Sequence, residues 1–337
     1  HSPAYPLILA GIFLFFGHGS GGAAVAIVLS IILSALLIYM VFRFVERVFN
    51  TGSGFAAAAI VAFYPAQIYY SASVLPTVLY ELMLLVSVAL AWRLRSDPTK
   101  TNAAWWGLAL GLSALSYTFV LALAPFLASW IILSAGLKRW RKTAPAVAIA
   151  ALVAIAMISP WTIRNYAVHQ RWIPVRDQFG TNLWGGNNPG ASAAEEARRG
   201  KYLGQFPEDV EKALRSIPNE VDQDRYLRER ALEYIRENPG ITAGNWLSRI
   251  GSYWRFRRDN VGEHSGMARF MPVLKTAKAL LLLLSVAGLA LLWRRVRSLV
   301  ILVLTVCVPM TMVLILTLAD RIRYFTPLEP ILPIPAG

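Results

Sequence analysis

Charged residues are scarce in this sequence: Lys, Arg, Asp and Glu make up 15% of the chain, whereas the hydrophobic set makes up 56%. Soluble domains carry about 25% charged residues, so the composition excludes an ordinary water-soluble enzyme. Cysteine is nearly absent as well. The single residue, Cys307, excludes an intrachain disulfide and any metal site built from several cysteines.

Acidic residues are rarest in the short breaks between the long apolar runs. These breaks hold 12 basic residues but only two acids, Glu46 and Asp97, and so account for +10 of the net charge of +14. The basic residues are Arg43, Arg47, Arg93, Arg95, Lys100, Lys138, Arg139, Arg141, Lys142, Arg294, Arg295 and Arg297. Basic residues gathered in short loops are a signal of membrane topology. We therefore predict a polytopic membrane protein with the lipid bilayer, and no nucleic acid, as its partner.

Apolar runs of about 20 residues, the length that crosses a bilayer as a helix, predict an all-α transmembrane bundle. The expected crossings are 23–45, 54–74, 77–94, 103–118, 119–135, 144–163, 273–293 and 298–318. The run 4–16 is too short to cross. We divide the chain into a first transmembrane part at 1–163, a lobe at 164–270 and a last transmembrane part at 271–337.

The orientation follows from placing every basic break on the cytoplasmic side. Residues 164–270, with 17 basic and 14 acidic residues, and the tail after 318 are then extracytoplasmic. The expected location is the cell (inner, cytoplasmic) membrane.

The lobe is expected to be mixed in structure. Its Gly- and Asn-rich part at 164–189 predicts an irregular loop, and helices are expected at 192–203, 207–216, 222–237 and 243–257. The last helix carries Trp246, Leu247 and Ile250 beside Arg249. This pattern is typical of a helix in the membrane interface, and equally of one that packs onto the lobe.

Two segments carry a resemblance to a known group: Pro160-Trp-Thr-Ile-Arg-Asn-Tyr166 and Gly180-Thr-Asn-Leu-Trp-Gly-Gly-Asn-Asn-Pro189. Three others agree with it, namely Ser2-Pro-Ala-Tyr-Pro6, Tyr234-Ile-Arg-Glu-Asn-Pro239 and Arg321-Ile-Arg-Tyr324. In this order, and with this topology, the chain resembles the GT-C membrane glycosyltransferases. It is most similar to bacterial proteins of the family 39 type, such as protein O-mannosyltransferases and lipid A aminoarabinose transferases.

The resemblance implies a GT-C-like bundle with the lobe inserted before the last two helices. It also implies that a hexosyl or pentosyl group moves, with inversion, from a polyprenyl phosphate to an acceptor glycan, lipid or protein on the outer face. A carboxylate would deprotonate or orient the acceptor, and cations would hold the charge that grows on the phosphate.

The sequence departs from the family at its expected catalytic residue. The resemblance implies an Asp in the first external loop, yet no acid precedes Glu46. Because the chain starts at His1 and its first residues look like the stretch that follows that loop, we expect the Asp upstream of an N-terminally truncated chain. A naturally inactive relative is the alternative.

Glu81 is the candidate accessory acid. Relatives often carry a Glu near the position of Thr77, and Glu81 lies one helical turn further into the expected span. An acid inside a span is a functional candidate because burial of its charge is costly. The alternative is a neutral, hydrogen-bonded Glu81 that stabilises helix packing.

Candidates for donor phosphate binding are Arg321, Arg323 and Tyr324 after the last span, and Arg164 after the 144–163 span. The guanidinium fork matches phosphate oxygens. Arginines at helix ends also reach toward lipid head groups without any ligand, and such lipid anchoring is the alternative to phosphate binding.

Asn165, Asn187 and Asn188 are candidates for a substrate loop, and a purely structural turn is the alternative. No cofactor is required by the residues. Some relatives use a divalent metal ion, and the sequence leaves this unassigned.

Two further functions compete with a glycosyltransferase. A flippase or transporter of lipid-linked sugar should show internal repeats and broken helices, which we do not find in the sequence. A non-catalytic membrane subunit of a glycan assembly machine would fit the absence of the Asp.

Overall fold

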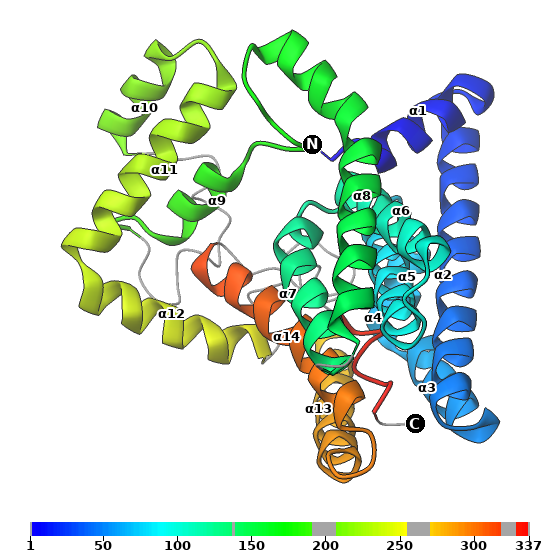
Figure 1. The fold of residues 1–337 in the computed structure, drawn as a ribbon. Helices are drawn as coiled ribbons and strands as arrows, with labels where there is room; N and C mark the ends of the chain where they lie inside the picture. The colour runs from blue at the N-terminus through cyan, green and yellow to red at the C-terminus, as the bar shows by residue number, and fades with distance from the viewer. Residues whose placement is uncertain (1, 137–138, 191–206, 255–269, 318–327, 336–337) are drawn as a thin grey trace. The chain divides into compact units, whose positions relative to one another are not determined.

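The computed structural model describes residues 2–136, 139–190, 207–254, 270–317 and 328–335, and it forms helices and no strand within these ranges. The helices, drawn in Figure 1, are α1 (Ala4–Phe16), α2 (Ser20–Val48), α3 (Thr51–Phe63), α4 (Pro65–Ser71), α5 (Thr77–Ser96), α6 (Lys100–Ser116), α7 (Phe119–Ser134), α8 (Trp140–His169), α9 (Phe179–Gly186), α10 (Glu208–Ser216), α11 (Glu220–Glu237), α12 (Pro239–Trp254), α13 (Met271–Leu292) and α14 (Arg297–Leu316). The predicted all-α class of polytopic membrane protein is confirmed.

The chain divides into two compact units. The lobe unit comprises Thr162–Lys275 and Met310–Phe325, and the bundle unit comprises Ser2–Trp161, Thr276–Pro309 and Thr326–Gly337. The end of α14 therefore groups with the lobe unit.

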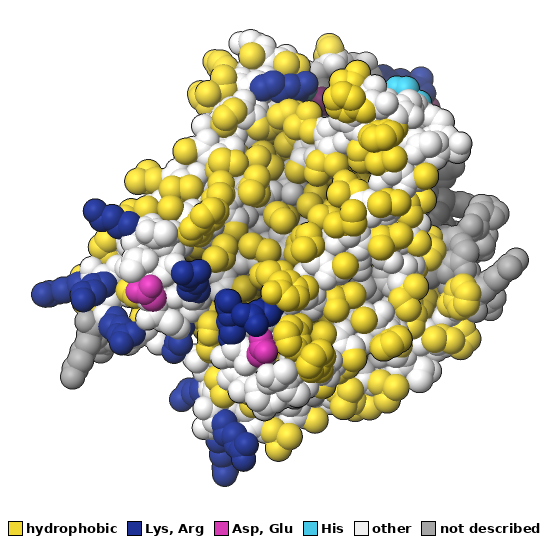
Figure 2. Space-filling view, turned by 90° about the vertical axis from the view of Figure 1, so that its right-hand side faces the viewer, with side chains coloured by type: hydrophobic (Ala, Val, Ile, Leu, Met, Phe, Trp, Pro, Cys, Tyr) yellow, Lys and Arg dark blue, Asp and Glu magenta, His cyan; other side chains and the backbone are white. Residues whose placement is uncertain are grey.

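Among the described residues, five helices are long and apolar enough to cross a membrane: α2, α5, α8, α13 and α14. Large hydrophobic side chains are exposed on the bundle unit, among them Leu14, Phe15 and Ile31. The face in Figure 2 shows a broad spread of hydrophobic side chains, with Lys and Arg gathered toward one edge. Such a surface is solvated by lipid rather than by water.

The expected 54–74 crossing is divided into two helices. Helix α3 begins at a side-chain cap, where the Asn50 Oδ1 accepts from the Ser53 N–H at 3.0 Å. It ends before Tyr64, whose backbone is extended, and α4 begins at Pro65. The residue before a proline is restricted to extended backbone, so Pro65 explains both the break and the new helix start.

Close packing in the bundle unit depends on two glycines of α6. A Cβ at Gly107 would collide with the Ala150 carbonyl oxygen on α8, and a Cβ at Gly111 would lie 2.6 Å from the Met157 Cβ. Glycines four residues apart allow two membrane helices to approach at backbone distance. This contact places α6 against α8.

The lobe unit differs from the sequence-based expectation at one point. The prediction of an irregular loop throughout 164–189 is wrong, because residues 179–186 form α9 and α8 continues to His169. The Asp224 carboxylate on α11 accepts from the N–H groups of Gly180 and Thr181 at 2.8 and 2.7 Å. It thus caps first-turn donors that the local sequence leaves without an acceptor.

The predicted lobe helices at 207–216, 222–237 and 243–257 correspond to α10, α11 and α12. The expected helix at 192–203 lies outside the described residues. Leu183 and Trp184 of α9 pack with Val210, Leu227 and Ala231 to form the core of the lobe unit.

Candidate functional site

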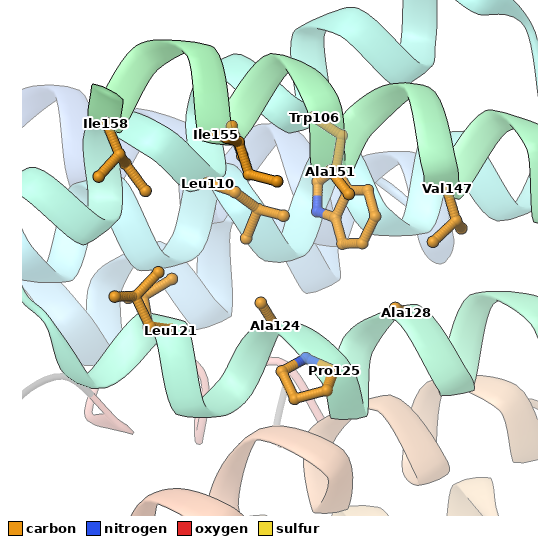
Figure 3. Close-up of a pocket in the computed structure, with 12 residues that line it drawn as sticks. Trp106, Leu110, Leu121, Ala124, Pro125, Ala128, Val147, Ala151, Ile155 and Ile158 are labelled. Carbon is orange, nitrogen blue, oxygen red and sulfur yellow. The ribbon is translucent and has the colours of Figure 1, made fainter. Parts of the chain in front are cut away.

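An apolar slot lies between α6, α7 and α8 within the bundle unit (Figure 3). Its volume is about 250 Å³, and hydrophobic side chains line it throughout. On α8 the lining runs from Val147 to Ile158, which at 1.5 Å per residue is about 16 Å along the helix. Ile155 at the rim is 63% exposed, so the slot opens at the lipid-facing surface.

Proline explains how α7 can line this slot. Pro125 lies inside α7 and faces the slot together with Ala124 and Ala128. Proline in a helix interior removes one backbone hydrogen bond and bends the helix, and the two alanines leave space that larger side chains would fill. The result is an elongated apolar volume at membrane depth, suited to a flexible hydrocarbon chain.

One polar atom belongs to the slot lining. The Trp106 ring reaches between α7 and α8 (Figure 3), and the residue is 1% exposed. Within the described part of the chain its Nε1–H has no acceptor. A buried donor without a partner costs about 1–3 kcal/mol, so a ligand with an acceptor atom would gain from this position.

Glu81 lies in a second, buried and charged part of the bundle unit. It is 1% exposed on α5, and its charge acts on the Tyr64 hydroxyl at the α3–α4 break. Glu329 acts on the same hydroxyl and attracts the Lys278 ammonium group on α13. Lys278 and Glu329 are 2% and 3% exposed. The structure thus brings these four side chains into one buried cluster.

Sequence reasoning missed Lys278 and Glu329. Lys278 lies inside the predicted 273–293 span, and a charge within a span is a functional candidate by itself, so this signal was available. Glu329 carried no such signal, because it follows the last span. The Ser285 hydroxyl on α13 donates to the Leu332 carbonyl oxygen at 2.7 Å, which shows that 328–335 returns to pack beside α13.

Arg164 and Asn165 lie in the last turns of α8, within the lobe unit. The Arg164 side chain is exposed, and its Nη1 donates to the Asn165 Oδ1 at 3.3 Å. Asn165 is buried, and its Nδ2 donates to the carbonyl oxygens of Ile173 and Val175 at 3.1 and 3.2 Å. Asn165 therefore holds the chain that follows α8 and leaves Arg164 at the surface.

Asn187 and Asn188 are buried at the end of α9. Asn187 Nδ2 donates to the Leu183 and Leu316 carbonyl oxygens, both at 2.8 Å, and Asn188 Nδ2 donates to the Trp184 carbonyl oxygen at 2.7 Å. Asn187 joins α9 to the end of α14, whereas Asn188 bonds back to α9 itself. The Nδ2 groups of both residues donate to main-chain carbonyl oxygens, which supports a structural part for them within the lobe unit.

Arg321, Arg323 and Tyr324, the main candidates for phosphate binding, lie outside the described residues. In the described ranges no three His, Cys, Asp or Glu side chains are arranged to hold a metal ion.

Comparison with known families bears on the first half of the chain. A family model described as dolichyl-phosphate-mannose-protein mannosyltransferase matches residues 1–163. This half of the chain is similar to that family. The mannosyltransferase-family match spans 163 of the 337 residues and contains the whole slot and Glu81, but it ends before Arg164. No curated protein and no solved structure matches the chain.

Proposed function

We propose that this chain is a membrane glycosyltransferase that takes a sugar from a polyprenyl phosphate and passes it to an acceptor on the extracytoplasmic face. The observation that carries the proposal is the apolar slot at membrane depth, which lies entirely within the residues that match the mannosyltransferase family. A donor whose tail resides in the bilayer needs such a volume between helices. The hydrocarbon tail would enter at the lipid-facing rim near Ile155.

The reaction is a displacement at the anomeric carbon. The acceptor oxygen forms a bond to that carbon, the carbon–oxygen bond to phosphate breaks, and the phosphate leaves with the electron pair. The acceptor proton passes to a carboxylate. Glu81 is the proposed accessory acid in this step, supported by its burial and by the neighbouring Tyr64 and Lys278 cluster.

Arginine side chains are proposed to hold the leaving phosphate. Arg164, exposed at the end of α8, is one of them. Arg321 and Arg323, with Tyr324 beside them, are the others and are supported by the sequence alone. A guanidinium group keeps its charge near lipid and presents paired donors to phosphate oxygens.

The test uses the full-length protein in proteoliposomes with polyprenyl phosphate donors that carry radiolabelled sugars. Ala151→Phe fills the slot, and we expect it to raise KM about tenfold for a long-chain donor while it changes KM little for a short-chain donor. Ala148→Phe adds the same ring at an exposed position on the same helix and is the matched control.

Glu81→Gln, which keeps the shape of the side chain, is expected to lower kcat with little effect on KM. No transfer from any donor would refute the proposed function. Equal KM values for both chain lengths in Ala151→Phe would refute the slot as the tail site, even if transfer occurs.

A further inference from the structure

Helix α12 is attached to the end of a membrane span. The Arg249 Nη1 donates to the carbonyl oxygens of Ile315 and Thr317 at 3.0 and 3.3 Å, and its Nη2 donates to the Gly186 carbonyl oxygen. Asn187 adds a second link, because its Nδ2 donates to the Leu316 carbonyl oxygen and its Oδ1 accepts from the Trp246 Nε1 at 3.0 Å. All of these residues belong to the lobe unit.

These bonds fix the depth of α12 in the membrane. Helix α14 has 20 residues and is apolar enough to span a bilayer, and its length of about 30 Å equals the thickness of the hydrocarbon core. Its last carbonyl groups therefore lie at a bilayer surface. Because Arg249 bonds to those carbonyl groups, α12 lies at the level of the interface.

The side of α12 that faces away from these contacts is apolar. Ile241, Leu247 and Ile250 are 57%, 69% and 42% exposed. Within the described part of the chain, a Cβ at Gly240, Gly244 or Gly251 would meet nothing within 4 Å, so no described residue covers this side. From 239 to 254 the only charged residue is Arg249, and it points to the other side.

The sequence had placed Trp246 and Arg249 on one face with Leu247 and Ile250. The structure separates them: Trp246 and Arg249 bond within the lobe unit, whereas Leu247 and Ile250 are exposed. The two interpretations of this helix are therefore compatible, since one side packs and the other is free for a different contact.

We propose that the exposed side of α12, defined by Ile241, Leu247 and Ile250, inserts into the outer leaflet and anchors the lobe to the phospholipid surface. A helix with one apolar face lies in the interface plane, with that face buried about 5–10 Å into the boundary of head groups and acyl chains. The chain itself supports the bilayer as occupant, because Arg249 holds α12 at the end of α14, a helix long and apolar enough to span the membrane.

The experiment measures the surroundings of single residues in the full chain. With the buried Cys307 replaced by Ala, a spin label is placed at Leu247→Cys or at Ile250→Cys, and the protein is reconstituted in phosphatidylcholine–phosphatidylglycerol vesicles. We expect collisions with oxygen to exceed collisions with a water-soluble nickel complex about fivefold at both positions. Glu229→Cys, exposed on the charged helix α11, is the control and should show the reverse.

Two results would overturn the proposal. Nickel accessibility at Leu247 equal to that at Glu229 would show that the face is in water. Protection from both reagents would show that a second copy or another protein covers it. If the Cys307→Ala background does not fold, a photoreactive residue at Leu247 in the native background gives the same decision: lipid adducts support the proposal, and protein adducts or an absence of lipid adducts overturn it.

Discussion

Asp177 and Asp224 lie close enough in the lobe unit for the carboxyl group of Asp224 to favour the protonated form of Asp177. Asp224 also accepts from the Thr181 hydroxyl at 2.8 Å, in addition to the two N–H groups at the start of α9. Burial raises the pKa of Asp177 to about 7, and the hydrogen bond and charge of Asp224 act in the same direction. The folded lobe therefore favours a protonated Asp177 beside Asp224 below about pH 7.

The raised pKa of Asp177 predicts that the stability of the lobe unit depends on pH. The unfolded chain releases the Asp177 proton near pH 4 and the folded chain near pH 7, so the free energy of unfolding falls as pH rises between these values. We expect hydrogen exchange in α9 and α11, corrected for the intrinsic rate, to be faster at pH 8 than at pH 5. Asp177→Asn should flatten this dependence, because an amide donates to Asp224 at every pH.

The control for this prediction is Glu229→Gln, which removes an exposed carboxylate from α11. It should retain the pH dependence of the native chain. If Asp177→Asn and the native chain respond equally to pH, the protonation of Asp177 is not the cause.

Two buried tryptophans of the bundle unit predict different costs of substitution. The Trp130 Nε1 donates to the Ser298 carbonyl oxygen at 3.2 Å, whereas the Trp106 Nε1 has no acceptor in the described part of the chain. Replacement by Phe removes a similar volume in both cases. Trp130→Phe should therefore be less stable than Trp106→Phe by about 1 kcal/mol, the net value of one hydrogen bond.

Thermal unfolding in detergent, without a lipid donor, measures this difference. The reverse order of stability would contradict the assignment of the two N–H groups.

At Gly107, the addition of a single methyl group is expected to lower the stability of the protein strongly. The added Cβ would collide with the Ala150 carbonyl oxygen, so Gly107→Ala should push α6 from α8 and destabilise the chain by about 1–3 kcal/mol. Gly11→Ala adds the same methyl group on α1, where nothing lies within 4 Å, and should be neutral or stabilising. Equal unfolding midpoints for the two variants would show that the helices are not in backbone contact.

The buried pair Lys278 and Glu329 predicts coupled substitutions. Replacing either residue removes the interaction and leaves the other polar side chain buried without it, so Lys278→Met and Glu329→Gln should each lower the unfolding midpoint. The unfolding midpoint of the double variant should fall by less than the sum of the decreases in the two single variants. Lys275→Met removes an exposed charge from the same helix and serves as the control.

This double-mutant cycle distinguishes pairing from independent roles. Additive losses would show that Lys278 and Glu329 do not interact, and an effect of Lys275→Met as large as that of Lys278→Met would assign the loss to α13 itself.

The sequence alone determined the class of this protein and most of its helices. Apolar runs of bilayer length and basic residues in the breaks depend only on the transfer of side chains between water and lipid, which is a local property. The helices α10 and α11 followed from their caps and periodicity for the same reason.

Only the tertiary structure decided which distant residues meet. Helix α9 forms because Asp224, more than 40 residues away in the sequence, accepts from its first N–H groups. The Lys278 and Glu329 pair and the apolar slot likewise arise from segments that no local pattern connects. The two sides of α12 were assigned by the contacts of Arg249, since a long side chain on an amphipathic helix can reach either solvent or protein, and only the position of its acceptors determines which.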